Sequence, residues 1–154
     1  ERAVRQVQRS TLVRSVGRCV EVTARRTKVD FVAFVKNLLE TVYATALTVH
    51  LVLDNLNTHF RQTFVDVLGE TASAAVLQRV QFHYTPKHAS WLNMAEIEIG
   101  IMDRQCTGRR IATAELLQRE VQQWQQQRNL AGQGIDWKFT RQDADRKLCR
   151  HYVS

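Results

Sequence analysis

Apolar residues recur at spacings of three and four between residues 27 and 42, and this period predicts an amphipathic helix. Thr27 is a suitable N-cap, and Asp30 lies in the first turn. The helix should therefore turn one apolar stripe toward a core. The stripe consists of Phe31, Phe34, Val35, Leu38, Leu39 and Val42.

Short apolar runs without a helical period predict strands on either side of a second helix. Residues 47–53 are few and rich in branched side chains, which favours a strand buried on both faces. Residues 80–84 predict another strand, and β-branched residues at 19–23 predict an earlier one. The intervening helix should carry Phe60, Phe64, Val67 and Leu68.

The remaining pattern predicts helices at about 91–106, 113–129 and 140–152, with a short segment at 135–139 before the last. Strands that alternate with helices indicate an α/β fold. Residues 1–19 show no sustained period and are left unassigned, so the predicted domain covers residues 20–154.

Composition narrows the class of protein. A chain of 154 residues with 44% hydrophobic residues can bury one ordinary core. The net charge of +7 suits a nucleic acid partner and is equally compatible with general solubility. The three cysteines are far apart and lack a metal-binding spacing, so we expect reduced thiols in a cytoplasmic protein. No apolar run is long enough to predict a membrane span.

Two acidic residues are candidates for chemistry. Asp54 follows an apolar strand directly, and open α/β sheets bind ligands at the carboxyl ends of their strands. The alternative is an aspartate that only caps the next loop. Glu96 belongs to a helix that is apolar around much of its circumference, so the presence of a charged carboxylate on that helix requires an explanation. The alternative there is that Glu96 and Glu98 occupy the solvated face.

Asp54, Asn55 and His59 form one block, and Glu96 follows Asp54 by 42 positions within a second block, residues 84–96. Together these blocks resemble the second and third acidic motifs of the mariner-type transposases of bacterial insertion sequences. Those enzymes belong to the DDE superfamily and have an RNase H-like fold. Flanking segments extend the resemblance to roughly residues 20–152.

The resemblance implies that Asp54 and Glu96 are catalytic and bind metal. Two divalent cations about 3.5–4 Å apart can activate a water or a 3′-hydroxyl and stabilise the leaving oxygen at a phosphodiester. Mg²⁺ suits this role, with Mn²⁺ as a substitute. Glu98 would lie about 200° around the helix from Glu96, so the two cannot serve the same site. The implied partners are double-stranded DNA, as transposon ends and target, and a second subunit of a homodimer.

Other residues of the two blocks receive supporting roles by the same resemblance. Asn55 and His59 would position a metal-bound water, a phosphate or the loop, although both residues could simply stabilise that loop. Asn93 would shape the approach to Glu96. Four cations near the Glu96 helix are candidates for neutralising DNA phosphates, or are ordinary solvated charges: Lys87, Arg104, Arg109 and Arg110.

The chain departs from the family pattern in one essential residue. The family requires a first catalytic aspartate on the first strand of its sheet, and the only aspartate before Asp54 is Asp30, in a predicted helix. The family's helix-turn-helix region for DNA recognition is also not found. We therefore expect an RNase H-like fold that is incomplete at its N-terminal strands and a catalytic domain with impaired cleavage. The alternative is a non-catalytic DNA-binding or dimerising transposase remnant.

Overall fold

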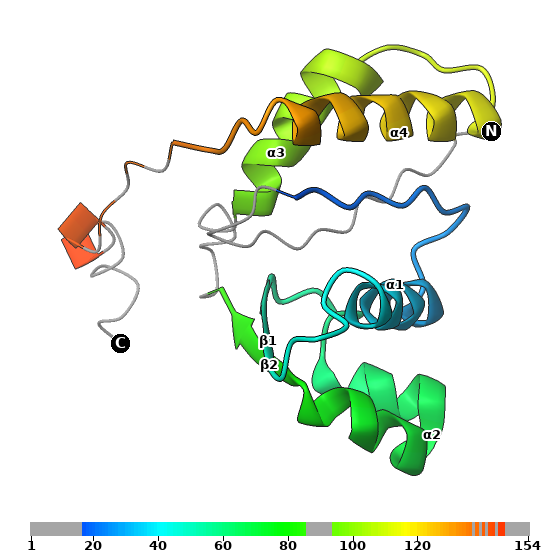
Figure 1. Cartoon of the computed structure of the whole chain (residues 1–154), viewed down its shortest axis with the longest axis vertical. Helices are drawn as coiled ribbons and strands as arrows, with labels where there is room; N and C mark the ends of the chain where they lie inside the picture. Colours follow the sequence, from blue (N-terminus) through cyan, green and yellow to red (C-terminus); the bar gives the residue numbers. More distant parts are fainter. Residues whose placement is uncertain are drawn as a thin grey trace.

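A computed structural model describes residues 17–85, 94–136, 138, 140, 142, 143, 145 and 146 of the chain. It has the predicted mixed α/β character, with α1, α2 and the sheet at one end and α3 and α4 at the other (Figure 1). The elements in chain order are α1 (Lys28–Glu40), β1 (Val49–Leu53), α2 (Arg61–Gln78), β2 (Val80–Tyr84), α3 (Met94–Met102), the π-helical turn η2 (Asp103–Thr107) and α4 (Ala114–Leu130).

The two strands form a parallel pair, in register from Val49 opposite Val80 to Leu53 opposite Tyr84. Burial alternates along β1, so the prediction of a strand buried on both faces was wrong: the side chains of His50 and Val52 are exposed. The apolar run was misleading because it begins before the strand does, and Leu47 is 91% exposed. Parallel pairing brings the carboxyl ends of both strands to the same edge of the sheet.

Helix α1 begins where the sequence predicted. Thr27 and Asp30 form a reciprocal capping box, in which each side chain accepts a hydrogen bond from the other's backbone N–H. The carboxylate of Asp30 is therefore occupied at the start of a helix. Val42 does not belong to the stripe, since it lies beyond the C-cap Thr41 and its side chain is exposed.

One hydrophobic core joins α1, α2 and both strands. Phe64 lies at its centre and is completely buried, with its ring edge-on to Phe31 and Phe82. Gly69 interrupts α2 with a φ of 77°, a conformation that glycine adopts without a steric penalty, and the helix kinks there. The kinked helix carries the chain from the end of β1 to the start of β2, as a parallel pair requires.

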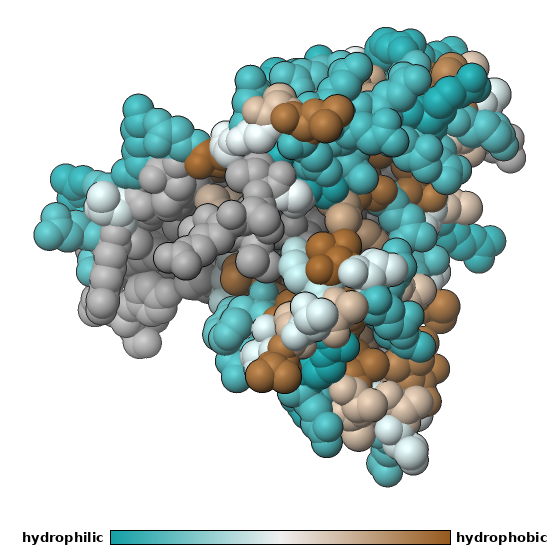
Figure 2. All heavy atoms as spheres, viewed as in Figure 1, coloured by the Kyte–Doolittle hydropathy of each residue, from teal (hydrophilic) through white to brown (hydrophobic). Residues whose placement is uncertain are grey.

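A second core lies between the C-terminal end of α3 and α4, where Met102, Leu117 and Val121 are buried with Trp124. The predicted helix at 91–106 consists of α3 and η2, and its first three positions lie outside the described residues. The surface over α4 is mainly hydrophilic (Figure 2). Among the described helices, none is both long and apolar enough to cross a membrane.

The predicted strand at 19–23 is absent; residues 17–23 are extended without a strand partner in the described part of the chain. Side chains of α4 take the hydrogen bonds that a neighbouring strand would take. The backbone N–H of Arg18 donates to Asn129 Oδ1 at 2.8 Å, and that of Val20 donates to Gln125 Oε1 at 2.6 Å. Of the helix predicted at 140–152, residues 142, 143, 145 and 146 are described and helical.

Arg79 closes the loop that leads from α1 to β1. Its guanidinium donates hydrogen bonds to the backbone carbonyls of Tyr43 at 2.6 Å and Ala46 at 3.0 Å, with longer ones to Leu39 and Ala44. These carbonyls include one at the C-terminal end of α1, where a cation is electrostatically favoured. Arg79 directly precedes β2, so these bonds hold the loop before β1 close to the start of β2.

We predict that Arg79→Met, which keeps the aliphatic stem and removes the donors, lowers the free energy of unfolding by about 2 kcal/mol. Urea denaturation measures this difference. Arg119→Met, at an exposed position of α4, is the matched control and should change stability by less than about 0.5 kcal/mol. An Arg79→Met protein as stable as the control would show that the loop does not depend on these bonds.

Candidate functional site

The carboxyl ends of β1 and β2 are tied together by hydrogen bonds beyond the last strand pair. The backbone N–H of Thr85 donates to the carbonyl of Leu53 at 2.9 Å. The side-chain amide of Asn55 donates to the carbonyl of Thr85 at 2.6 Å. Asp54 lies between these two bonds in the sequence, so its backbone is held on both sides.

Within the described residues, only one oxygen of the Asp54 carboxylate has hydrogen-bond partners. Its Oδ1 lies 2.6 Å from His59 Nδ1 and 3.4 Å from the backbone N–H of Leu56. The side chain is 36% exposed, and no described residue hydrogen-bonds to Oδ2. One oxygen is thus fixed by the loop, while the other has no hydrogen-bond partner within the part of the chain that the structure describes.

Three buried polar atoms near this edge have no hydrogen-bond partner among the residues that the structure describes: Thr58 Oγ1, His59 Nε2 and Thr85 Oγ1. His59 packs its ring against Phe31, with ring centroids 4.8 Å apart. Unpartnered polar atoms in the interior are costly and are commonly satisfied by a bound water or ion. Thr58 and His59 belong to the loop that follows Asp54, and Thr85 directly follows β2, so all three atoms lie on segments that leave this edge of the sheet.

This donor set fits one side of a divalent-cation site. Mg²⁺ prefers hard oxygen ligands and retains several of its waters, and the partly exposed carboxylate of Asp54 is a ligand of this kind. A complete site needs more, because the described residues contain no group of three or more His, Cys, Asp or Glu side chains able to hold a metal. Within the described residues this edge therefore offers one carboxylate and no complete metal site.

Glu96 lies in the first turn of α3 with its side chain exposed, and no described residue pairs with its carboxylate. No hydrogen bond among the described residues links it to Asp54. The structure therefore leaves both candidate acids accessible without showing a direct connection between them.

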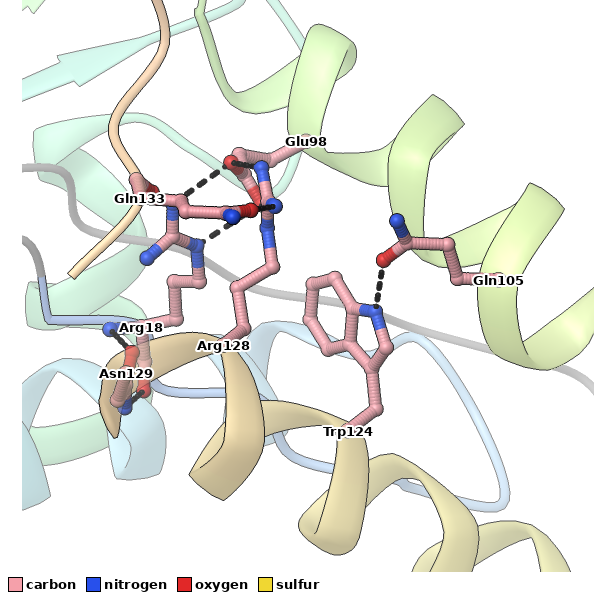
Figure 3. Close-up of polar contacts among 7 residues, drawn as sticks. All are labelled: Arg18, Glu98, Gln105, Trp124, Arg128, Asn129 and Gln133. Carbon is pink, nitrogen blue, oxygen red and sulfur yellow. Dashed lines mark hydrogen bonds and ion pairs between the residues drawn. The ribbon is translucent and has the colours of Figure 1, made fainter. Parts of the chain in front are cut away.

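Glu98 does not occupy the solvated face of α3, which corrects one alternative considered from the sequence. It is 2% exposed and is enclosed by two arginines (Figure 3). Arg18 binds it in a bidentate manner, through Nε at 2.9 Å and Nη2 at 2.8 Å, and Arg128 Nη2 donates to Oε1 at 2.9 Å. Both arginines also donate to Gln133, and Asn129 holds the backbone of Arg18. Helices α3 and α4 and the extended segment meet at this carboxylate.

The charge state of Glu98 follows from two opposing effects. Burial alone would raise the pKa of Glu98, but the hydrogen bonds and charges of Arg18 and Arg128 outweigh it and lower the pKa to about 2. Glu98 is therefore ionised at neutral pH and committed to its two arginines. It is a structural ion pair and is not free to bind a metal.

The cations proposed for DNA contacts differ in their availability. The guanidinium of Arg104, in η2, lies close to Gly100. A Cβ atom placed on Gly100 would be 3.6 Å from Arg104 Nη1. Arg109 is paired with Glu120, and Arg110 is exposed. Lys87 and Asn93 lie outside the described residues.

An open pocket of about 440 Å³ lies at η2, lined by Asp103, Arg104, Gln105, Cys106, Gly108 and Arg109.

Comparison with known proteins decides the family. The family model described as DDE superfamily endonuclease matches residues 12–118. The chain belongs to the DDE superfamily of endonucleases. No curated protein and no solved structure matches this DDE endonuclease chain. Membership implies a nuclease that acts on DNA with divalent metal ions and has an RNase H-like fold.

Sequence reasoning missed the polar network that organises this DDE endonuclease domain. Arg18 and Asn129 are 111 positions apart, and no local pattern connects them. The one available signal was Glu98 itself, an acid within an otherwise apolar helix. Thr85 and Thr58 gave no signal, because a threonine beside a strand end is common and only the fold shows that their hydroxyls are buried and unpaired.

We predict that Glu98→Gln lowers the free energy of unfolding of the DDE endonuclease domain by about 3–5 kcal/mol at neutral pH, since it leaves two buried arginines without their counter-charge. The pKa of Glu98 falls from its ordinary value of 4.5 to about 2 on folding, so this stabilisation is present above pH 4.5 and is lost as the pH falls toward 2. The difference in the free energy of unfolding between the wild type and Glu98→Gln should therefore become smaller as the pH falls from 4.5 toward 2.

Urea denaturation at a series of pH values measures this difference. Glu70→Gln, at an exposed position of α2, is the control and should follow the wild type throughout. An unchanged stability of Glu98→Gln at neutral pH would contradict the assigned role of the ion pair.

Proposed function

We propose that residues 20–154 form part of the catalytic domain of a mariner-type insertion-sequence transposase, an enzyme class that cuts and joins DNA phosphodiesters, and that Asp54 and Glu96 are its metal ligands. The observation that carries the proposal is Asp54, which follows β1 with one oxygen fixed by His59, the other without a partner among the described residues, and a side chain that is 36% exposed. A carboxylate at the carboxyl end of parallel strands occupies the usual ligand position of such sheets.

The neighbours of Asp54 act by holding it. His59 Nδ1 fixes one carboxylate oxygen at 2.6 Å, and Phe31 packs against the imidazole ring. Asn55 joins the ends of the two strands through its bond to Thr85, so the loop cannot move away from the sheet edge. When bound, a pair of divalent cations supplies Lewis-acid stabilisation of the attacking and leaving oxygens.

Glu96 would contribute the second carboxylate from α3. Its accessibility follows from the burial of Glu98, which lies about 200° away around the helix and binds inside the fold. Arg104 and Arg110 would contact DNA phosphates, while Arg109 would first have to exchange Glu120 for a phosphate. Asn93 keeps its proposed supporting role at Glu96, and Lys87 keeps its proposed contact with DNA phosphates. The substrate would be double-stranded DNA at transposon ends and target, bound by a homodimer, with Mg²⁺ or Mn²⁺.

A second candidate function is a non-catalytic DNA-binding or dimerising remnant, and one observation favours it. Asp30, the only aspartate before Asp54, has its carboxylate bound to the Thr27 backbone and hydroxyl at 2.8 and 2.7 Å. It caps α1 through Oδ2 and lies in the first turn of a helix, not on a strand, where the family's first catalytic aspartate is expected. With two of three carboxylates, we expect cleavage by this chain to be weak or absent.

We predict that any Mg²⁺- or Mn²⁺-dependent nicking of duplex DNA by the purified chain is lost in both Asp54→Asn and Glu96→Gln. The loss should exceed the roughly 10–100-fold that follows removal of an outer-shell partner of a metal ligand. Conversion of supercoiled plasmid to the open circular form measures nicking. Glu70→Gln and Asp136→Asn, both exposed, are the matched controls.

The outcomes separate the two candidate functions. Cleavage that depends on both acids supports a working site. A folded, DNA-binding chain without cleavage supports the remnant. Cleavage that survives Asp54→Asn would overturn the assignment of the site.

A further inference from the structure

Four aromatic rings lead from the core to the edge of the sheet that carries Asp54. Phe64 is completely buried, and its ring lies edge-on to Phe82 with centroids 5.7 Å apart. Phe82 and Tyr84 lie on the same side of β2 and are nearly parallel, with centroids 6.3 Å apart and an interplanar angle of 16°. Phe60, which precedes α2, is 5.5 Å from Tyr84. The outermost rings are therefore supported from the core.

The two outermost rings remain open to solvent. Phe60 is 38% exposed and Tyr84 is 37% exposed, although the rings behind them are packed. Tyr84 cannot turn freely, because its hydroxyl donates to the backbone carbonyl of His59 at 3.2 Å. The result is a pair of exposed aromatic faces in a fixed orientation at the end of β2.

This pair is physically linked to the proposed metal ligand. The same residue, His59, accepts the hydrogen bond from Tyr84 through its backbone and binds Asp54 through its ring at 2.6 Å. Arg61 directly follows Phe60, has an exposed side chain and is close enough to Tyr84 for its charge to act on the hydroxyl. Two aromatic faces, a cation and a carboxylate thus share one edge.

We propose that Phe60 and Tyr84 form a stacking platform for an unpaired nucleobase of the DNA strand held at Asp54, with Arg61 beside the neighbouring phosphate. This inference rests on the proposed function. Every base has a π-face, so stacking on an aromatic ring does not depend on sequence, and arginine can neutralise the backbone. Bases inside a duplex are already stacked on one another. The platform therefore selects DNA whose end is opened or frayed over intact duplex.

A nucleobase explains the pair better than the apolar side chain of a protein partner does. Arg61 adjoins the rings, and the chain carries a net charge of +7, which both favour a polyanion. A protein-binding patch would bind DNA with and without unpaired bases equally well. That difference provides the test.

The experiment measures binding of the whole chain, in EDTA to prevent cleavage, to a blunt duplex and to the same duplex with a few unpaired nucleotides at one end. Fluorescence anisotropy gives the affinities, and 2-aminopurine at the unpaired position reports stacking through quenching. We expect roughly tenfold tighter binding to the opened end and quenched 2-aminopurine. Phe60→Ala and Tyr84→Ala should each lose both effects and keep wild-type affinity for the blunt duplex.

Two further variants guard against misfolding as the explanation. Tyr84→Phe keeps the ring and should keep the preference and the quenching. Leu130→Ala removes a side chain that is 88% exposed on α4 and should behave as the wild type. Circular dichroism confirms that each variant is folded.

Equal affinity for both DNAs, or a preference that survives both alanine variants, would overturn the stacking platform while leaving the proposed function standing. If the folded wild-type chain binds neither DNA, the proposed function fails and the platform fails with it. Binding of both DNAs in EDTA without quenching, by a chain that nicks plasmid in the separate metal-dependent assay, overturns the platform alone.

Discussion

The parallel pairing of β1 with β2 is the constraint on which the candidate site depends. Parallel strands need a crossover, and the kinked helix α2 supplies it while it buries Phe64 against both strands. The register then places the residues after Leu53 and Tyr84 at one edge, where Asn55 and Thr85 bond to each other. Asp54 is held at this edge by geometry that the hydrophobic core enforces. A slip of the register would separate Asn55 from the Thr85 carbonyl that it binds.

The other end of the molecule depends on a buried ion cluster instead. Glu98 must be enclosed by Arg18 and Arg128, because an unpaired carboxylate in that position would be strongly destabilising. This requirement sets the rotation of α3 about its axis and thereby leaves Glu96 exposed. The buried acid determines where the accessible acid points. Glu98 is engaged in the ion cluster, and Glu96 remains exposed on the same helix.

The sequence predicted those features that depend on local pattern. The cap of α1 at Thr27, the limits of β2 and the start of α4 after Thr113 are encoded by residues close together in the chain, and all three are confirmed. Features that depend on distant partners were missed. Residues 17–23 pair with side chains of α4 more than 100 positions away, so β-branching there predicted a strand that does not form. The aromatic series from Phe64 to Phe60 was equally hidden, because it follows from packing between α2 and β2. Asp54 was found because it directly follows an apolar run, but its open oxygen appears only in the fold.

The central claim is that a divalent cation binds at Asp54, and paramagnetic relaxation by Mn²⁺ tests it most directly. In ¹H–¹⁵N spectra of the whole chain, substoichiometric Mn²⁺ should first broaden the amide signals of Leu53, Asn55 and His59, and Asp54→Asn should abolish this selectivity. Thr85, across the strand pair, should respond with them, since its amide bonds to Leu53. Selective broadening at this edge that disappears in the variant would support the account. Broadening centred elsewhere, or unchanged in Asp54→Asn, would contradict it.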